Sequence, residues 1–281
     1  MSDRYFEIKS RILDTAKSDK SVKAVVAIGS SVRSDIKADE YSDLDLLIAA
    51  DDTESWLYGN IPEKIGNIKV SFVENSLDGA KERRVLYENA LDVDMIVFTP
   101  EQFTAAIKEG VAEWVCNRGY TVLYDIMDCE KMLSENVSCE IKHNILSEDE
   151  YTNTVNDFCF HIVWASKKIL RGELWTAKMC IDAYLKNHLL KMIEMYSVCR
   201  YNTDVWHDGR FLDRWADDKI KEALPECFAR YNKDDMISAL YKTKALFVQL
   251  AKETAEANGY KYPKTAVDYA DDLLSEYFSV K

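Results

Sequence analysis

The pattern of apolar residues changes near residue 148 of the 281-residue chain, and this change constrains the fold more than any other feature. Before it, apolar residues form short runs that alternate with polar residues or are rich in β-branched side chains, which is typical of strands. These runs lie at 22–29, 44–50, 68–74, 83–100 (as two strands) and 120–125. After it, apolar residues have helical spacing, in segments 148–171, 173–198, 211–223 and 234–258.

The order of these segments predicts an α+β protein in which a mixed sheet with helices is followed by a helical bundle. Helical spacing also occurs at 3–17 and after Pro100, so helices accompany the strands of the first half. The chain has only nine glycines and four prolines, which favours long uninterrupted elements. A polar stretch at 135–148 separates the halves, and we predict domains at 1–140 and 141–281.

The charge of the chain limits its partners. It has 36 basic and 49 acidic residues, a net charge of −13, which disfavours binding to a nucleic-acid backbone and suits a cationic ligand or metal ions. No apolar run approaches the length of a membrane span, so we expect no membrane partner. Seven cysteines without a Cys-x-x-Cys pair predict free thiols and a cytoplasmic protein.

Two short motifs predict a phosphate and metal site. The first strand ends at Gly29-Ser30, where a glycine lets the backbone approach a ligand and a hydroxyl can hold phosphate oxygens. The second strand opens with Asp43-Leu44-Asp45, and side chains two apart on a strand share a face. Two close carboxylates repel each other unless a cation neutralises them, and magnesium prefers such oxygen ligands together with substrate phosphates.

A third carboxylate opens a later strand. Asp94 directly precedes the apolar run Met-Ile-Val-Phe, as Asp45 precedes Leu-Leu-Ile-Ala. Asp92 shares the face of Asp94 by the period of two, so the pattern does not choose between them. Three strand-borne carboxylates facing a phosphate-binding turn are typical of a two-metal site for phosphoryl or nucleotidyl transfer.

These residues resemble a known family. The segment GSSVRSDIKADEYSDLDL (29–46) is similar to the Gly-Ser…Asp-x-Asp segment of nucleotidyltransferases of the DNA polymerase β type. Nearly the whole chain resembles the aminoglycoside 6-adenylyltransferases (streptomycin adenylyltransferases), with their second-domain motifs at 169–182, 188–194 and 207–215. Ser31, Asn187-His188 and Arg210 depart from the residues usual in that family.

The resemblance implies roles for the first-domain motifs. The Gly29-Ser30 turn would bind the triphosphate of ATP. Asp43 and Asp45 would each ligate two magnesium ions, and Asp94 would ligate one of them.

For the second domain, the resemblance implies a carboxylate that takes the proton of the acceptor hydroxyl, and Asp182 is our candidate. Lys178, one helical turn earlier, would contact phosphate or pair with Asp182. Arg210 is a candidate for binding the triphosphate.

The implied activity is magnesium-dependent transfer of AMP from ATP to a hydroxyl of a cationic, streptomycin-type aminoglycoside, which releases pyrophosphate and inactivates the antibiotic. We expect a monomer or weak dimer with no nucleic-acid partner. One alternative keeps the chemistry and changes the acceptor to a lincosamide or a protein side chain. Others are a nucleotide-binding module without catalysis and a tRNA-modifying transferase, which the net charge of −13 opposes.

Overall fold

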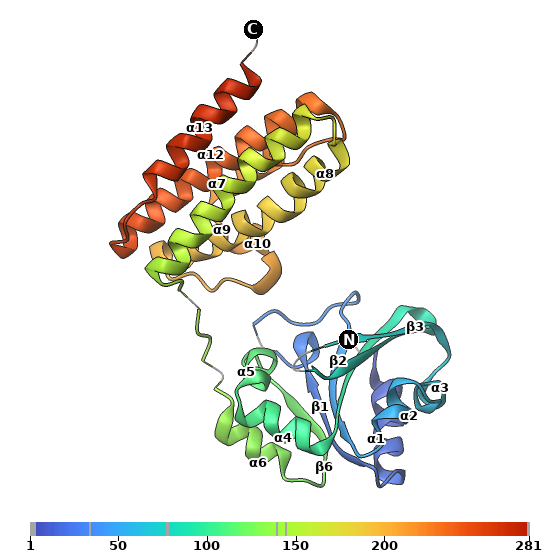
Figure 1. Ribbon diagram of the computed structural model, residues 1–281. Coiled ribbons are helices and arrows are strands. Elements are labelled where there is room, and N and C mark those ends of the chain that lie inside the picture. The colour runs from blue at the N-terminus through green and yellow to red at the C-terminus, as the bar shows by residue number, and fades with distance from the viewer. Residues whose placement is uncertain (1–3, 34, 77–78, 139, 144, 280–281) are drawn as a thin grey trace. The chain divides into compact units, whose positions relative to one another are not determined.

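The computed structural model describes residues 4–33, 35–76, 79–138, 140–143 and 145–279. The chain divides into two compact units, Met1–Ile141 and Lys142–Lys281. The first is built on a sheet and the second is helical (Figure 1). This is the α+β class that the sequence predicts.

The sheet of the first unit has the strand order β3-β4-β5-β2-β1-β6. Its strands are β1 (Val22–Ile28), β2 (Leu44–Ala50), β3 (Ile68–Asn75), β4 (Lys81–Tyr87), β5 (Leu91–Phe98) and β6 (Thr121–Asp125). The pair β2–β5 is parallel and the other neighbouring pairs are antiparallel, so the sheet is mixed. The central strands β1 and β2 are buried along nearly their whole length, which explains their continuous apolar sequence.

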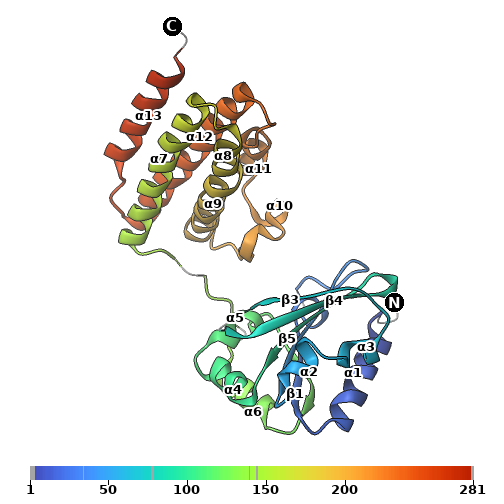
Figure 2. The same cartoon turned by 45° about the vertical axis from the view of Figure 1, so that its right-hand side comes forward.

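Helices cover both faces of this sheet (Figure 2). Those on one face are α1 (Phe6–Ser18), α2 (Thr53–Leu57) and α3 (Ile61–Ile65). Those on the other are α4 (Pro100–Lys108), α5 (Val111–Cys116) and α6 (Cys129–Asn136). Two apolar clusters, one on each face, hold the layers together.

The helical unit has one continuous apolar core. Its helices are α7 (Glu148–Leu170), α8 (Leu174–Met179), α9 (Leu185–Tyr201), α10 (Leu212–Trp215), α11 (Asp218–Ala223), α12 (Lys233–Asn258) and α13 (Lys264–Phe278). In the core, Phe158 of α7 stacks on Phe247 of α12 with ring centroids 3.6 Å apart. The hydroxyl of Tyr151 also donates to the carbonyl of Ala251 at 2.7 Å, so α7 and α12 are joined at two points.

Two of the predicted helices differ from expectation. The segment predicted at 173–198 is interrupted by a π-helical turn, Cys180–Tyr184, between α8 and α9. The segment predicted at 211–223 is broken at Ala216, whose backbone is extended. There the Asp217 side chain accepts from the Lys219 N–H and starts a new helix, α11.

Two smaller expectations can also be compared with the structure. Among the helices of the described residues, none combines the length and the apolar character needed to cross a bilayer. The six cysteines within the described ranges are free thiols, and Cys139 lies outside those ranges.

Candidate active site

Three acidic side chains converge at one end of the parallel strand pair. Asp45 on β2 and Asp94 on β5 are register partners, and Asp43 directly precedes β2. One carboxylate oxygen from each of the three residues lies within 4.8 Å of those of the other two. Such an arrangement of hard oxygen ligands suits a divalent cation.

Asp94 is the buried member of this carboxylate triad, with 7% of its surface exposed. Burial raises the pKa of Asp94 to about 7, and the neighbouring carboxylates of Glu82, Asp92 and Asp43 contribute to the rise. The guanidinium of Arg84, 3.4 Å from Asp94, acts in the opposite direction. A bound cation favours the charged form of such a carboxyl, and three converging carboxylate oxygens are ligands that suit magnesium.

Asp92 lies outside the triad although it shares the strand with Asp94. Asp92 is exposed as a residue, but its carboxyl is partly desolvated. This desolvation and the charge of Asp43 raise the pKa of Asp92. The sequence pattern left the choice between Asp92 and Asp94 open. The register of β2 against β5 brings Asp94 beside Asp45.

Arg84 on β4 is a site residue that the sequence reasoning missed. Its guanidinium lies 2.7 Å from Glu74 and 3.0 Å from Glu82, besides its contact with Asp94. Arg84 is the register partner of Asp94, so both side chains leave the same face of the sheet. The alternating sequence of β4 indicated the face on which Arg84 lies. Only the pairing of β4 with β5 identifies Asp94 as its partner.

The Gly-Ser turn packs against the triad. Gly29 has a left-handed backbone (φ +67°), and a Cβ at this position would lie 2.1 Å from the Oδ2 of Asp45. The hydroxyl of Ser30, which is buried, donates to the carbonyl of Asp43 at 3.2 Å. In this structure Gly29 therefore makes room for Asp45, and Ser30 fixes the backbone from which Asp43 projects.

Asp182 and Lys178 form an ion pair in the helical unit. Asp182 lies on the π-helical turn with 17% of its side chain exposed, and it accepts from the Ala229 N–H at 3.4 Å. The ammonium of Lys186 is 3.9 Å away. We expected Lys178 to contact phosphate or to pair with Asp182, and in the structure it pairs with Asp182.

Arg210 is separate from that ion pair. It is exposed and follows the 3-10 turn His207–Gly209, and its carbonyl accepts from the indole N–H of Trp215 at 2.8 Å. Its backbone is thereby fixed while its guanidinium faces solvent.

A second polar cluster lies between α7 and α9, where sequence spacing gave no signal. The carboxylate of Asp157 is 2.6 Å from Nδ1 of His161 and 3.5 Å from Nε2 of His188. The hydroxyl of Tyr184 donates to both of its oxygens, at 3.0 and 3.1 Å. Packing of α7 against α9 brings together residues that lie up to 31 positions apart in the sequence.

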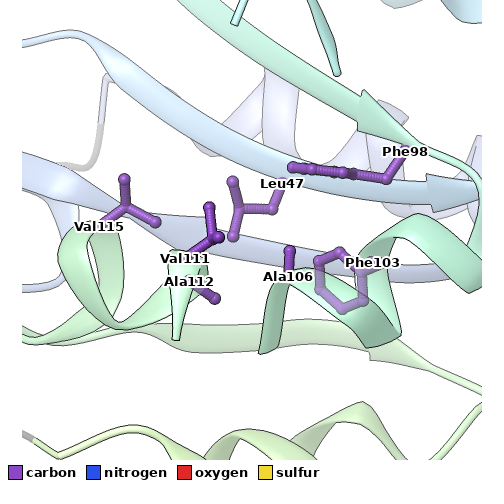
Figure 3. Close-up of a pocket in the computed structure, with 7 residues that line it drawn as sticks. All are labelled: Leu47, Phe98, Phe103, Ala106, Val111, Ala112 and Val115. Carbon is purple, nitrogen blue, oxygen red and sulfur yellow. The ribbon is translucent and has the colours of Figure 1, made fainter. Parts of the chain in front are cut away.

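An apolar pocket lies between the sheet and the helices α4 and α5 (Figure 3). Its lining consists of Leu47, Phe98, Phe103, Ala106, Val111, Ala112 and Val115. It presents no polar side chain, so it offers no group for catalysis and is separate from the carboxylate triad.

Comparison with protein families gives a match over residues 4–277, to the family described as streptomycin adenylyltransferase. The chain, which combines a mixed sheet and helices with a helical unit, is thus a nucleotidyltransferase, an enzyme. The chain belongs to the streptomycin adenylyltransferase family.

Two solved structures are similar to this chain at low sequence identity. An aminoglycoside 6-adenyltransferase from Bacillus subtilis is 16% identical, with 98% of this chain and 97% of that chain covered and a TM-score of 0.48. A nucleotidyltransferase-like protein from Exiguobacterium sibiricum 255-15 is 11% identical, with 90% and 78% covered and a TM-score of 0.38. Among curated proteins, no sequence is similar enough to count as a match.

Proposed function

We propose that this enzyme transfers AMP from ATP to a hydroxyl of a cationic aminoglycoside of the streptomycin type, releasing pyrophosphate and inactivating the antibiotic. The observation that carries the proposal is the carboxylate triad in a chain of the streptomycin adenylyltransferase family. The acceptor is a polycation, which agrees with a protein of net charge −13.

In this proposal the triad holds two magnesium ions. Asp43 and Asp45 would hold both ions and Asp94 one of them, and the mutual proximity of their oxygens supports a metal site at this place. Bound magnesium supplies positive charge that stabilises the α-phosphate and the departing pyrophosphate during in-line attack. Arg84 keeps the carboxylate of Asp94 in place through their contact at 3.4 Å.

The triphosphate of ATP binds at the Gly29-Ser30 turn, beside the triad. The backbone there lies close to Asp45, so phosphate oxygens at the turn are within the reach of ions on the carboxylates. Arg210 is a further ligand of the triphosphate, for which its exposed guanidinium is suited. Lys178 is a further phosphate ligand if it leaves its ion pair with Asp182.

Asp182 takes the proton from the acceptor hydroxyl. A carboxylate has about four lone-pair sites, so the ion pair with Lys178 and the Ala229 N–H leave acceptor capacity on Asp182. Asp182→Asn should lower turnover by about 10²–10⁴-fold, because the amide cannot take a proton. ATP affinity should change little.

Single-turnover adenylylation across pH, with the enzyme saturated in ATP, tests this role. The variant should be slow at every pH tested, because the amide cannot take a proton. Asp204→Asn, an exposed acid of the same unit, is the control. An unchanged single-turnover rate in Asp182→Asn would remove it as the base.

We place the enzyme in the cytoplasm, where its co-substrate ATP is available, as a monomer or weak dimer. Sedimentation at several protein concentrations tests the oligomeric state. A stable dimer at the lowest concentration would contradict it.

The activity itself is tested by incubating the protein with radiolabelled ATP and a panel of acceptors: streptomycin, a lincosamide and a protein mixture. We expect labelled streptomycin and stoichiometric pyrophosphate with magnesium, and neither product with a chelator. Label on the lincosamide or on protein alone would replace the acceptor and keep the chemistry. Nucleotide binding without pyrophosphate release from any acceptor would favour a binding module.

A further inference from the structure

The cluster of Asp157, His161, Tyr184 and His188 lies within the helical unit and takes no part in the reaction proposed above. Asp157 is partly accessible, with 29% of its side chain exposed. Its three partners come from α7, from the π-helical turn and from α9, so the packing of these elements builds the cluster. We call these four residues the Asp157 cluster.

The carboxylate at its centre has no permanently charged partner. Among the residues that the structure describes, no Lys or Arg nitrogen lies within 4.0 Å of Asp157, whose ion-pair partners are His161 and His188. Imidazoles carry charge only when protonated, and burial lowers the pKa of His188. Asp157 therefore differs from those half-buried acids of this unit whose carboxylates contact a lysine.

Three other half-buried acids of the same unit show the contrast. Their carboxylates each contact a lysine: Asp182 with Lys178, Glu173 with Lys168 and Glu253 with Lys219. A half-buried carboxylate without such a partner attracts a cation from solution.

Aromatic rings pack against the residues that contact this carboxylate. The ring of Tyr184 lies 4.2 Å from that of His161 and 5.0 Å from that of His188, measured between centroids. Phe160 packs edge-on against His161 at 5.2 Å. Tyr184, which contacts Asp157, is 39% exposed, and Phe160, three positions along α7 from Asp157, is 65% exposed, so both present aromatic surface to solvent.

A carboxylate flanked by exposed aromatic rings matches the chemistry of a guanidinium group. A guanidinium is planar and weakly hydrated, donates paired hydrogen bonds to a carboxylate and stacks on aromatic faces. The cation is also attracted to the ring faces electrostatically. A small hydrated cation would gain less from the rings.

We propose that the Asp157 cluster is a binding site for a guanidinium group carried by a cyclitol ligand. The guanidinium donates to Asp157 and lies against the rings of Tyr184 and Phe160. This assignment rests on the proposed function, in which the ligand is the acceptor of the adenylyl group. The Asp157 cluster then binds a part of the acceptor other than its reacting hydroxyl. Affinity for the acceptor then depends on a residue that touches neither ATP nor metal.

The test uses calorimetric titration of the full chain, without nucleotide, with three cyclitols. Streptidine carries two guanidinium groups, 2-deoxystreptamine carries two amines and myo-inositol is uncharged. We expect streptidine to bind more tightly than 2-deoxystreptamine, and myo-inositol not to bind. Asp157→Asn should weaken streptidine binding by about 10- to 100-fold, the range for a hydrogen bond to a charged group.

Two controls isolate the local effect. Asp218→Asn removes the same charge from an 87% exposed side chain of the helical unit and should leave binding unchanged. Tyr184→Leu should weaken streptidine binding about threefold or more through loss of the ring. Tyr269→Leu, at an exposed tyrosine of α13, is its match and should have no effect. Thermal unfolding of each variant verifies that it is folded.

The outcomes separate the site from the reaction. Equal streptidine affinity in the unmodified protein and Asp157→Asn, or no streptidine binding at all, overturns the assignment of the site. If adenylylation of streptomycin then proceeds, the proposed function stands alone. If streptidine binding requires Asp157 and no aminoglycoside is adenylylated, the guanidinium site stands and the proposed function fails.

Discussion

At the scale of single residues, the carboxylate triad combines three acids with different surroundings. Asp94 is buried beside Arg84, whereas Asp43 and Asp45 are half-buried. Because the three carboxylates repel each other without a cation, the site stores unfavourable electrostatic energy that a divalent ion relieves.

Asp45→Asn should lower magnesium-dependent adenylylation by at least about 10²–10³-fold, the range for losing one group that stabilises transition-state charge. Asp92→Asn provides the matched control, since Asp92 is exposed and outside the triad. Initial rates at saturating ATP and magnesium make the comparison. Near-normal turnover in Asp45→Asn would show that the triad is not the metal site.

We expect Glu194 on α9 to make a pH-dependent contribution to the free energy of unfolding. Burial raises its pKa to about 7, and Asp208 adds to the rise. Since the folded-state pKa lies above the unfolded one, this contribution is fully present below about pH 4.5 and is lost as pH rises through about 7. Glu194→Gln should therefore raise the urea midpoint at pH 8 relative to the unmodified protein.

The difference between the two proteins should shrink or reverse at pH 4–5. Unfolding curves at both pH values check this, with the exposed Glu276→Gln as the control. A difference independent of pH would mean that ionisation of Glu194 is not its cause.

At the scale of elements, the π-helical turn Cys180–Tyr184 has a visible structural support. The ammonium of Lys186, which is buried, donates to the carbonyl of Ile181 at 3.0 Å and to the hydroxyl of Thr243 at 2.8 Å. A π turn disrupts the regular hydrogen-bond ladder, and Lys186 satisfies a carbonyl within it. Burial lowers the pKa of Lys186 to about 8, while the charge of Asp182 opposes this shift. The position of Asp182 thus depends on α12 through Thr243.

The junction of β1 with the 3-10 turn Gly29–Ser31 places Gly29 against the side chain of Asp45, so a substitution there should disturb the metal site. Gly29→Ala should lower both metal binding and adenylylation, because the added Cβ would lie 2.1 Å from Asp45 and push its carboxylate away. Binding of Mn²⁺, followed by its paramagnetic signal, reads out the displacement apart from catalysis.

Gly110→Ala is the control for backbone strain. Gly110 is also left-handed (φ +81°), but a Cβ added there would meet no atom of the described residues within 4 Å. Both substitutions incur the cost of about 1–2 kcal/mol for a left-handed L-residue. If Gly110→Ala impairs Mn²⁺ binding equally, loss of stability rather than the clash with Asp45 is responsible.

At the scale of the whole molecule, the net charge of −13 bears on how a cationic acceptor arrives. An acidic protein attracts a polycation over long range, and salt screens this attraction with a Debye length of about 10 Å at 0.1 M. ATP is an anion and gains nothing from the negative charge of the protein as a whole. The KM values of the two substrates should therefore depend differently on salt.

We expect the KM for streptomycin to rise several-fold between about 0.02 and 0.3 M salt, while the KM for magnesium-bound ATP stays constant or falls. Initial rates at fixed free magnesium, with potassium chloride varied, give both constants. A KM for streptomycin independent of salt would mean that the acidic surface has no role in its capture.

Local periodicity was sufficient to predict the strands and the two longest helices of this protein. The strands β1 to β6 and the helices α7 and α12 lie where apolar spacing placed them, since burial of one face imposes that spacing on each element separately. The short helices α2, α3, α5 and α6 were not predicted, because short segments carry little periodic signal. The C-terminal α13 was also missed, although its buried residues Val267, Ala270 and Leu274 have helical spacing. The period of two also placed Asp43 and Asp45 on one face.

The partners of these residues depended on tertiary structure. The choice of Asp94 over Asp92 follows from the parallel register of β2 with β5, and the contact of Arg84 follows from the antiparallel register of β4 with β5. The Asp157 cluster likewise exists because α7 packs against the π-helical turn and α9. Periodicity specifies which face of an element is buried, but burial of apolar surface is non-directional and does not say which element covers it. The sequence by itself thus determined the elements and the acidic motif, and only packing between elements decided which side chains meet.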